Sequence, residues 1–71
     1  MYETAPGAVI SREIAAGLEK LPLYERAAVI HRDVERLPLR AVADQLGCSL
    51  PAARLHIANG RIKLLKRLRN L

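Results

Sequence analysis

The sequence contains no phenylalanine or tryptophan, and Tyr2 and Tyr24 are its only aromatic residues. Its remaining apolar residues are aliphatic, and they form no alternating run of valine, isoleucine and threonine of the kind that marks a half-buried strand. The 71 residues make one domain, and a domain near this size buries only about 60% of the surface of its unfolded chain. We therefore expect a small all-α domain with a narrow margin of stability.

Cysteine is also scarce, because Cys48 is the only one and has no partner for an intrachain disulfide. Together with two distant histidines it lacks the ligand spacing of a zinc site. The chain shows no pair of catalytic carboxylates, no nucleophile beside a base and no glycine-rich phosphate loop. We expect no metal, no other cofactor and no enzymatic activity.

Long apolar runs are missing too, since no stretch approaches the roughly 20 residues that cross a bilayer. The N-terminus has no charged leader followed by an apolar run of the export type. We therefore expect a cytoplasmic protein without a membrane partner. Residues 1–7 are predicted to form a linker or disordered end, residues 8–71 the domain, and the chain is expected to be a piece of a longer protein.

Acidic residues are absent from the last 23 positions. Residues 1–48 hold all seven acids and six Lys or Arg, a net charge of −1, whereas residues 49–71 have a net charge of +6. The cations of this segment are Arg54, Arg61, Lys63, Lys66, Arg67 and Arg69. A basic, helically spaced segment after a short helix and a turn is typical of a helix that enters a DNA groove. The charge pattern predicts a nucleic-acid partner.

The spacing of apolar residues predicts four helices. The first spans the apolar residues from Val9 to Leu21, with Ser11 or Thr4 as its cap, and it stops near Lys20 before Pro22. The second begins after that proline and runs to about residue 35. Its expected stripe consists of Leu23, Ala27, Ile30 and Val34.

Two more helices complete the predicted helix-turn-helix. The third covers about residues 39–46, opened by Pro38 and ended by Gly47, which tolerates a positive φ. The fourth covers about residues 50–68 and has Ser49 as its N-cap. The apolar stripe of the third is Leu39, Val42, Ala43 and Leu46, and that of the fourth is Leu50, Ala53, Ile57, Gly60, Leu64 and Leu68.

Two features of the fourth helix indicate its surroundings: Gly60 in its apolar stripe, and the residues on the side opposite Ile57. A mid-helix glycine costs about 1 kcal/mol relative to alanine, so Gly60 indicates that another backbone passes close, and we expect that neighbour to be the third helix. At 100° per residue, the opposite side should face the groove. It holds Pro51, Ala52, Leu55, Ala58, Asn59, Ile62, Lys63 and Lys66, flanked by Arg54 and Arg61.

Three segments carry a resemblance to a known family. They are Leu-Pro before Glu25-Arg26, the segment Arg32-Asp33-Val34-Glu35, and Leu39-Arg40-x-Val42-Ala43-x-x-Leu46-Gly47 leading into Ser49. Between about Ala8 and Leu68 the chain resembles the C-terminal fourth domain (region 4) of bacterial RNA polymerase sigma factors of the sigma-70 family, most closely the extracytoplasmic-function class. The resemblance implies that the last helix recognises the minus-35 promoter element. It further implies docking on core RNA polymerase and binding by an anti-sigma factor.

The resemblance also assigns roles to individual residues, including phosphate contacts for Arg40 and Ser49 at two helix starts. The residues implied to face the bases are Arg54, Leu55, Ala58 and Asn59, and those beside the DNA backbone are Arg61 and Lys63. His56 is either a polar residue at the edge of the core or a phosphate donor. Lys66, Arg67 and Arg69 lie beyond the groove and are expected to be solvated.

The recognition helix departs from the family pattern, which usually reads Thr-Val-Lys-Ser-Arg where this chain has residues 52–56, and arginine where it has Asn59. LuxR-type regulators carry the same residue types as His56, Asn59, Lys63 and Leu64, so a LuxR-type DNA-binding domain is an alternative. A third alternative is a protein-interaction module bound by an anti-sigma factor without DNA reading. It is indicated by the apolar patch of Leu55, Ala58 and Ile62.

Overall fold

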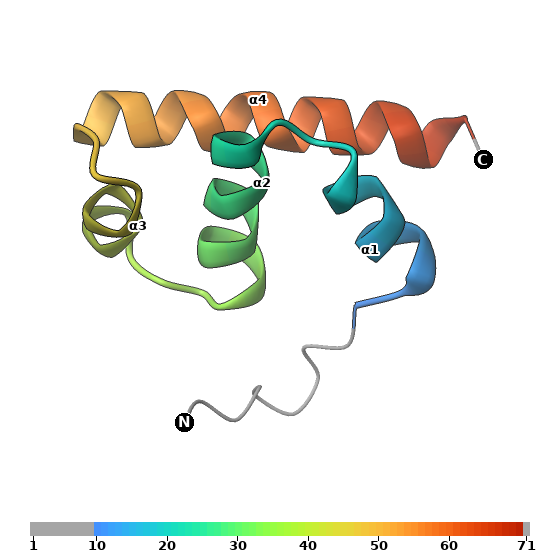
Figure 1. The fold of residues 1–71 in the computed structure, drawn as a ribbon, viewed down its shortest axis with the longest axis horizontal. Coiled ribbons are helices and arrows are strands. Elements are labelled where there is room, and N and C mark those ends of the chain that lie inside the picture. The colour runs from blue at the N-terminus through green and yellow to red at the C-terminus, as the bar shows by residue number, and fades with distance from the viewer. Residues whose placement is uncertain (1–9, 71) are drawn as a thin grey trace.

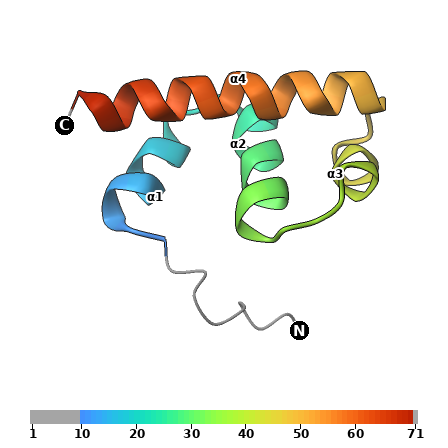
Figure 2. The same ribbon diagram turned by 180° about the vertical axis from the view of Figure 1, so that it is seen from behind.

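A computed structural model describes residues 10–70 of the chain. The elements are α1 (Arg12–Glu19), α2 (Leu23–Val29) with a π-helical last turn η1 (Ile30–Val34), α3 (Leu39–Leu46) and α4 (Leu50–Arg69). Helix α4 lies along one edge, and α3, α2 and α1 follow one another beneath it (Figures 1 and 2). The predicted all-α fold with four helices is confirmed. The predicted linker of residues 1–7 and the alternative cap Thr4 fall outside the described range.

Two serine caps begin the first and last helices. Ser11 Oγ accepts a hydrogen bond from the backbone N–H of Ile14 at 3.1 Å, and Ser49 Oγ accepts one from Ala52 at 3.2 Å. Each bond satisfies one of the N–H groups that have no partner within the helix. Ser49 was predicted as a cap, and Ser11 was one of the two caps that the sequence offered for the first helix.

The turn between α3 and α4 is fixed by Gly47. Its φ is +67°, in the left-handed region, as the sequence predicted. The Cys48 N–H donates to the Ala43 carbonyl at 3.0 Å and the Gly47 N–H to the Asp44 carbonyl at 3.2 Å. This pair of bonds is the Schellman arrangement that ends many helices, and α4 begins at Leu50, three residues after Gly47.

The second helix ends near the predicted position, but its last turn is wider than an α-turn. The Glu35 N–H donates to the Ile30 carbonyl and the Leu37 N–H to the His31 carbonyl, both at 2.9 Å. Arg36 then adopts a φ of 59°. This is an uncommon conformation for a residue other than glycine. The wide turn and the left-handed arginine redirect the chain toward α3, and neither was predicted.

Two adjoining clusters form the core. The first joins α2, α3 and α4 through Ala28, Val42, Ala43, Ala53 and Ile57. The second joins the α1 end to α2 through Leu18, Leu21 and Val29, with Leu64 of α4 packed against it. The apolar stripes predicted for α3 and for the middle of α4 therefore face the core.

The stripe predicted for the second helix was wrong in part. The buried residues of α2 are Ala28 and Val29, whereas Leu23 is 65% exposed. Helix α2 lies between α1 and α3 and beneath α4, so its buried surface is broader than one stripe and is centred on its later residues. Leu23 stands in its first turn, outside both clusters.

Gly60 does mark a close approach, but the neighbour is α2 and not α3. A Cβ atom on Gly60 would lie 2.6 Å from Val29 Cγ2 and 2.9 Å from the Glu25 carbonyl oxygen. The short turn after α3 keeps that helix beside the first half of α4, so the middle of α4 crosses α2 (Figure 1). No helix within residues 10–70 has both the length and the apolar character that crossing a bilayer requires.

Candidate nucleic-acid interface

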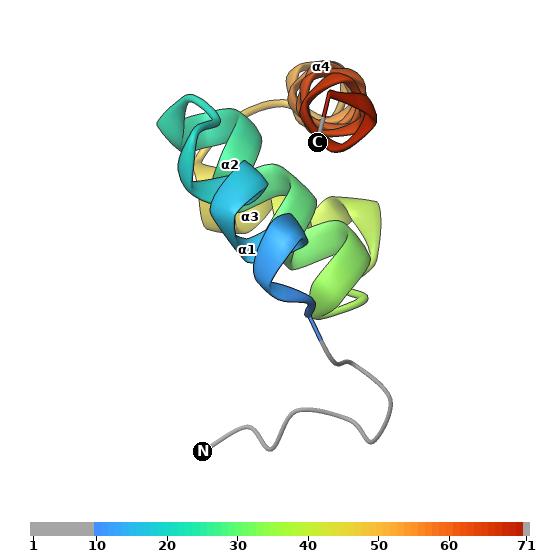
Figure 3. The same cartoon turned by 90° about the vertical axis from the view of Figure 1, so that its right-hand side faces the viewer.

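The side of α4 that faces away from the other helices is open to solvent. Viewed along its axis, α4 has the other three helices on one side only (Figure 3). Exposed residues of the open side are Pro51, Leu55, Ala58, Ile62, Leu65 and Lys66. Asn59 is half-buried on the same side. The described residues of the chain therefore leave this side free for a partner.

The two residues assigned to phosphates lie at helix starts, as predicted. Ser49 precedes α4, and its Oγ already accepts the capping bond from Ala52. The hydroxyl proton stays free to be donated, because a hydroxyl both accepts and donates. Arg40 is exposed in the first turn of α3. Both are therefore exposed at the start of a helix.

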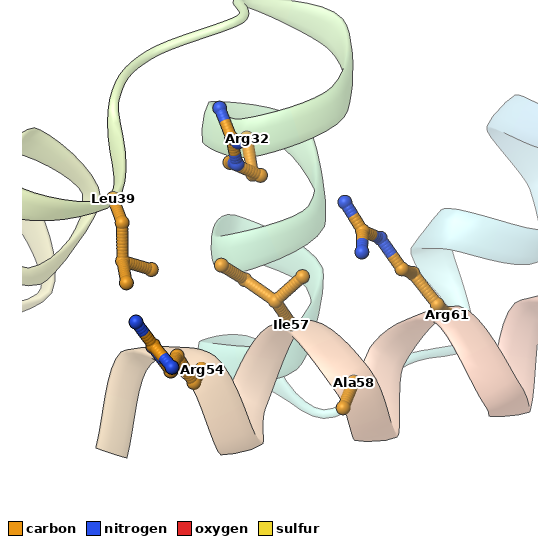
Figure 4. A pocket seen from close by; sticks show the side chains of 6 residues that line it. All are labelled: Arg32, Leu39, Arg54, Ile57, Ala58 and Arg61. Carbon is orange, nitrogen blue, oxygen red and sulfur yellow. The ribbon is translucent and has the colours of Figure 1, made fainter. Parts of the chain in front are cut away.

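An open depression of about 300 Å³ lies beside α4, and Figure 4 shows the side chains around it. Its lining residues are Arg32, Leu39, Arg54, Ile57, Ala58 and Arg61. Arg54 is exposed and takes part in no ion pair among residues 10–70. Its guanidinium can therefore meet a partner without first breaking an internal ion pair.

Arg61 differs from Arg54, because a carboxylate of η1 holds it. Its Nε donates to Asp33 Oδ2 at 2.9 Å and its Nη2 donates to Asp33 Oδ1. The hydrogen bond from Arg61 and the positive charge of its guanidinium lower the pKa of Asp33. The same hydrogen bond and the negative charge of Asp33 raise the pKa of Arg61. A bidentate pair of this kind fixes the direction of the guanidinium.

Lys63 is also bound within the domain. Its Nζ lies 2.8 Å from Glu25 Oε1 and 3.1 Å from Glu25 Oε2, and the first of these oxygens is shielded from solvent. The two cations expected beside the DNA backbone thus bind carboxylates of the second helix. Their partners lie 28 and 38 residues away in the sequence, and helical spacing alone carries no signal for such pairs.

His56 contacts an aromatic residue of α2. Its ring stacks on that of Tyr24, with centroids 5.6 Å apart and planes at 22°, and the residue is half-buried. Of the two readings left open by the sequence, this contact favours the structural one. Cys48 is also half-buried and packs against the cluster of Val42 and Ala53.

Comparison with known families identifies the arrangement. Residues 11–64 match the family described as Sigma-70, region 4, over more than half of the chain. The chain belongs to the sigma-70 region 4 family. Searches of curated proteins and of solved structures gave no match. Region 4 domains are non-enzymatic, DNA-binding parts of sigma factors, so this chain has a general role in promoter recognition and transcription initiation.

Within this region 4 domain, sequence reasoning missed three residues beside the candidate interface. Arg32 reaches the depression from η1 and donates to the Leu37 carbonyl at 3.0 Å. Glu25 binds Lys63, and Asp33 binds Arg61. Arg32 and Asp33 belong to the segment that carried the resemblance, and that segment was the available signal for them.

Proposed function

We propose that this region 4 domain reads the minus-35 element of a promoter through the open side of α4, as part of an alternative sigma factor. The observation that carries the proposal is the free position of Arg54 on a solvent-exposed helix in a chain of this family. An arginine fork pairs with the O6 and N7 atoms of guanine and gives about 1–3 kcal/mol of discrimination.

The proposed contacts divide into two groups. Arg54, Leu55, Ala58 and Asn59 are assigned to base edges, where leucine and alanine meet only thymine methyl groups or sugars. Phosphates are assigned to Arg40 and Ser49, and Arg32, which lines the depression beside Arg54, is added as a further cation. Arg61 and Lys63 are still proposed to contact the DNA backbone. Each would have to bind a phosphate while it also binds its carboxylate, Asp33 or Glu25.

The family match favours this function over a LuxR-type regulator. We further propose, from the family resemblance, that the surface around α4 docks on core RNA polymerase and is a target of an anti-sigma factor. That role places the protein in the cytoplasm with the polymerase. Binding by the isolated domain is expected to be weak, because the remaining contacts of the polymerase supply avidity.

The test is selection of duplexes from a random library by the 71-residue chain, followed by titration of an enriched duplex and a scrambled one by fluorescence anisotropy. We expect a preferred sequence to emerge. Arg54→Ala should lower the affinity for the enriched duplex about tenfold, as loss of one bidentate base contact predicts. The difference in affinity between the enriched and the scrambled duplex should shrink accordingly.

Two matched variants separate reading from general attraction. Arg40→Ala should lower the affinity for both duplexes equally. It should also reduce the slope of log affinity against log salt concentration by about 0.9, the value of one phosphate contact. Arg12→Ala removes the same charge from the first residue of α1, which is not assigned to DNA. It should change neither the affinity for the two duplexes nor the salt slope. Equal affinity of the native chain for enriched and scrambled duplexes, or an Arg54→Ala variant that behaves like Arg12→Ala, would contradict promoter reading.

A further inference from the structure

Arg36, in the turn between η1 and α3, has a backbone conformation that does not suit its residue type. Within residues 10–70 it is the only residue other than glycine with a positive φ, at 59°. Glycine adopts this left-handed conformation without a steric cost, and asparagine visits it more readily than other residues with a side chain. The path of the turn therefore gives no reason for an arginine at this position.

The residue after Arg36 holds it in this conformation. The Leu37 N–H donates to the His31 carbonyl at 2.9 Å, and the Leu37 carbonyl accepts a hydrogen bond from the Arg32 side chain at 3.0 Å. The Leu37 side chain also packs against the core cluster of α2, α3 and α4. A strained conformation persists only where the surrounding structure fixes it in this way. A residue with less strain at position 36 would therefore follow the same path.

The Arg36 side chain gains no compensating contact within the domain. It is exposed, and it takes part in no hydrogen bond or ion pair among the residues that the structure describes. The two nearest acids along the chain already have partners, since Asp33 binds Arg61 and Glu35 binds His31. Strain that no internal contact offsets points to a contact outside the domain.

Two other arginines place Arg36 in a row of positive charge. Arg32, Arg36 and Arg40 occur at intervals of four residues from η1 into the first turn of α3, and all three are exposed. The only acids within residues 30–41 are the two paired carboxylates just named. Arg32 also lines the depression that Arg54 lines. The row therefore adjoins the candidate interface, and the phosphates of a nucleic acid are the partner that fits its charge.

We infer that Arg36 binds a backbone phosphate of a bound DNA duplex, and that this contact offsets the strain of its left-handed conformation. The inference rests on the DNA binding proposed above but not on promoter reading, because a phosphate contact carries no base sequence information. Replacement of Arg36 relieves strain in the free domain and removes one cation from the complex. Stability and DNA affinity should therefore change in opposite directions.

The test compares Arg36→Asn with the native 71-residue chain in thermal unfolding and in anisotropy titration of the scrambled duplex. The melting temperature should rise by about 4 °C, because asparagine tolerates the left-handed conformation better than arginine. The affinity for the duplex should fall roughly fivefold to tenfold at about 0.1 M salt. The slope of log affinity against log salt concentration should be reduced by about 0.9, the value of one phosphate contact.

Arg36→Lys and Arg12→Asn are the matched controls. Lysine keeps both the positive charge and the strain, so Arg36→Lys should retain the native melting temperature, duplex affinity and salt slope. Arg12→Asn makes the same substitution at an exposed position, the first residue of α1. It should change neither the duplex affinity nor the salt slope.

Two outcomes for Arg36→Asn would overturn the inference. If its duplex affinity and salt slope equalled those of Arg12→Asn, the Arg36 side chain would only be solvated. If its melting temperature and duplex affinity both fell, the side chain would instead support the fold.

Failure of promoter reading would give a different result. The native chain would then bind the enriched and scrambled duplexes equally, while Arg36→Asn would still lower the affinity for both, which would support the phosphate contact. A native chain that binds neither duplex would contradict both proposals.

Discussion

At the scale of single residues, two buried glycines show how one missing methyl group positions α4. A Cβ on Gly60 would meet Val29 Cγ2 at 2.6 Å and the backbone oxygen of Glu25 at 2.9 Å. A Cβ on Gly17 would meet only Leu64 Cδ1, at 2.6 Å, which is the mobile end of a side chain. The Glu25 oxygen near Gly60 belongs to a helix backbone that must shift as a unit. The crowding at Gly17, in contrast, can be relieved by rotation of the Leu64 side chain.

Gly60→Ala and Gly17→Ala should therefore differ in their effects on the free energy of unfolding. We expect Gly60→Ala to destabilise the domain by about 1–3 kcal/mol, the usual cost of overpacking. For Gly17→Ala the relief by Leu64 and the better helix propensity of alanine offset the crowding, so the change should stay within about 1 kcal/mol. Urea denaturation followed by circular dichroism measures both, and equal losses would contradict the assignment of α2 as the rigid neighbour.

At the scale of the helix, the start of α4 combines a structural and a proposed binding role in one residue. Ser49 accepts the Ala52 N–H and so caps the longest helix of the domain. The same start has a positive helix dipole and no acidic residue in its first turn, which suits an approaching phosphate. Stability and the proposed phosphate contact thus depend on different properties of the Ser49 side chain.

Substitutions of Ser49 should separate these two roles. Ser49→Ala loses the cap and should lower the free energy of unfolding by about 1 kcal/mol. Ser49→Asp keeps a capping acceptor and should retain stability, but its carboxylate should repel phosphates and weaken duplex binding. Denaturation and anisotropy titration of the two variants test this, and an aspartate variant with native duplex affinity would remove Ser49 from the proposed interface.

At the scale of the whole molecule, two ion pairs connect α4 to the second helix. Arg61 binds Asp33 and Lys63 binds Glu25, beside the point where Gly60 lets the helices approach. The pairs hold the direction of α4 relative to the rest of the domain. Both side chains of the first pair are more than a third exposed, so we expect the pair to contribute at most about 1 kcal/mol.

The Asp33 pair should make stability depend on acid pH. Its hydrogen bond from Arg61 holds the pKa of Asp33 below the ordinary value of 3.8. The contribution is therefore fully present above about pH 4 and is lost as the pH falls through the lower pKa of the folded state. The difference in unfolding free energy between the native chain and Asp33→Asn should be constant from pH 5 to pH 8 and shrink below about pH 4.

Asp44→Asn provides the control for this measurement, because Asp44 is exposed on α3 and forms no ion pair within residues 10–70. Denaturation curves across the pH range should show no such change for it. If the difference in unfolding free energy between the native chain and Asp33→Asn grew on acidification, the direction of the pKa shift would be wrong.

Much of this domain follows from short stretches of sequence. The Ser49 cap, Ser11 as one of two candidate caps, the left-handed Gly47 and the breaks at Pro22 and Pro38 were predicted because each depends on residues within about one helical turn. The family resemblance, carried by short motifs of α2 and α3, was likewise readable and is confirmed by the match over residues 11–64. Of the candidate site, the open side of α4 and the helix-start positions of two residues could be predicted in this way.

What only the tertiary structure decided is which side chains remain available. Arg61 and Lys63 read as free cations in the sequence, yet their carboxylate partners are brought to them by the crossing of α4 over α2. The same crossing made α2 the neighbour of Gly60. Local periodicity fixes the face on which a residue lies, but the partner that meets it depends on helix packing between residues far apart in the chain.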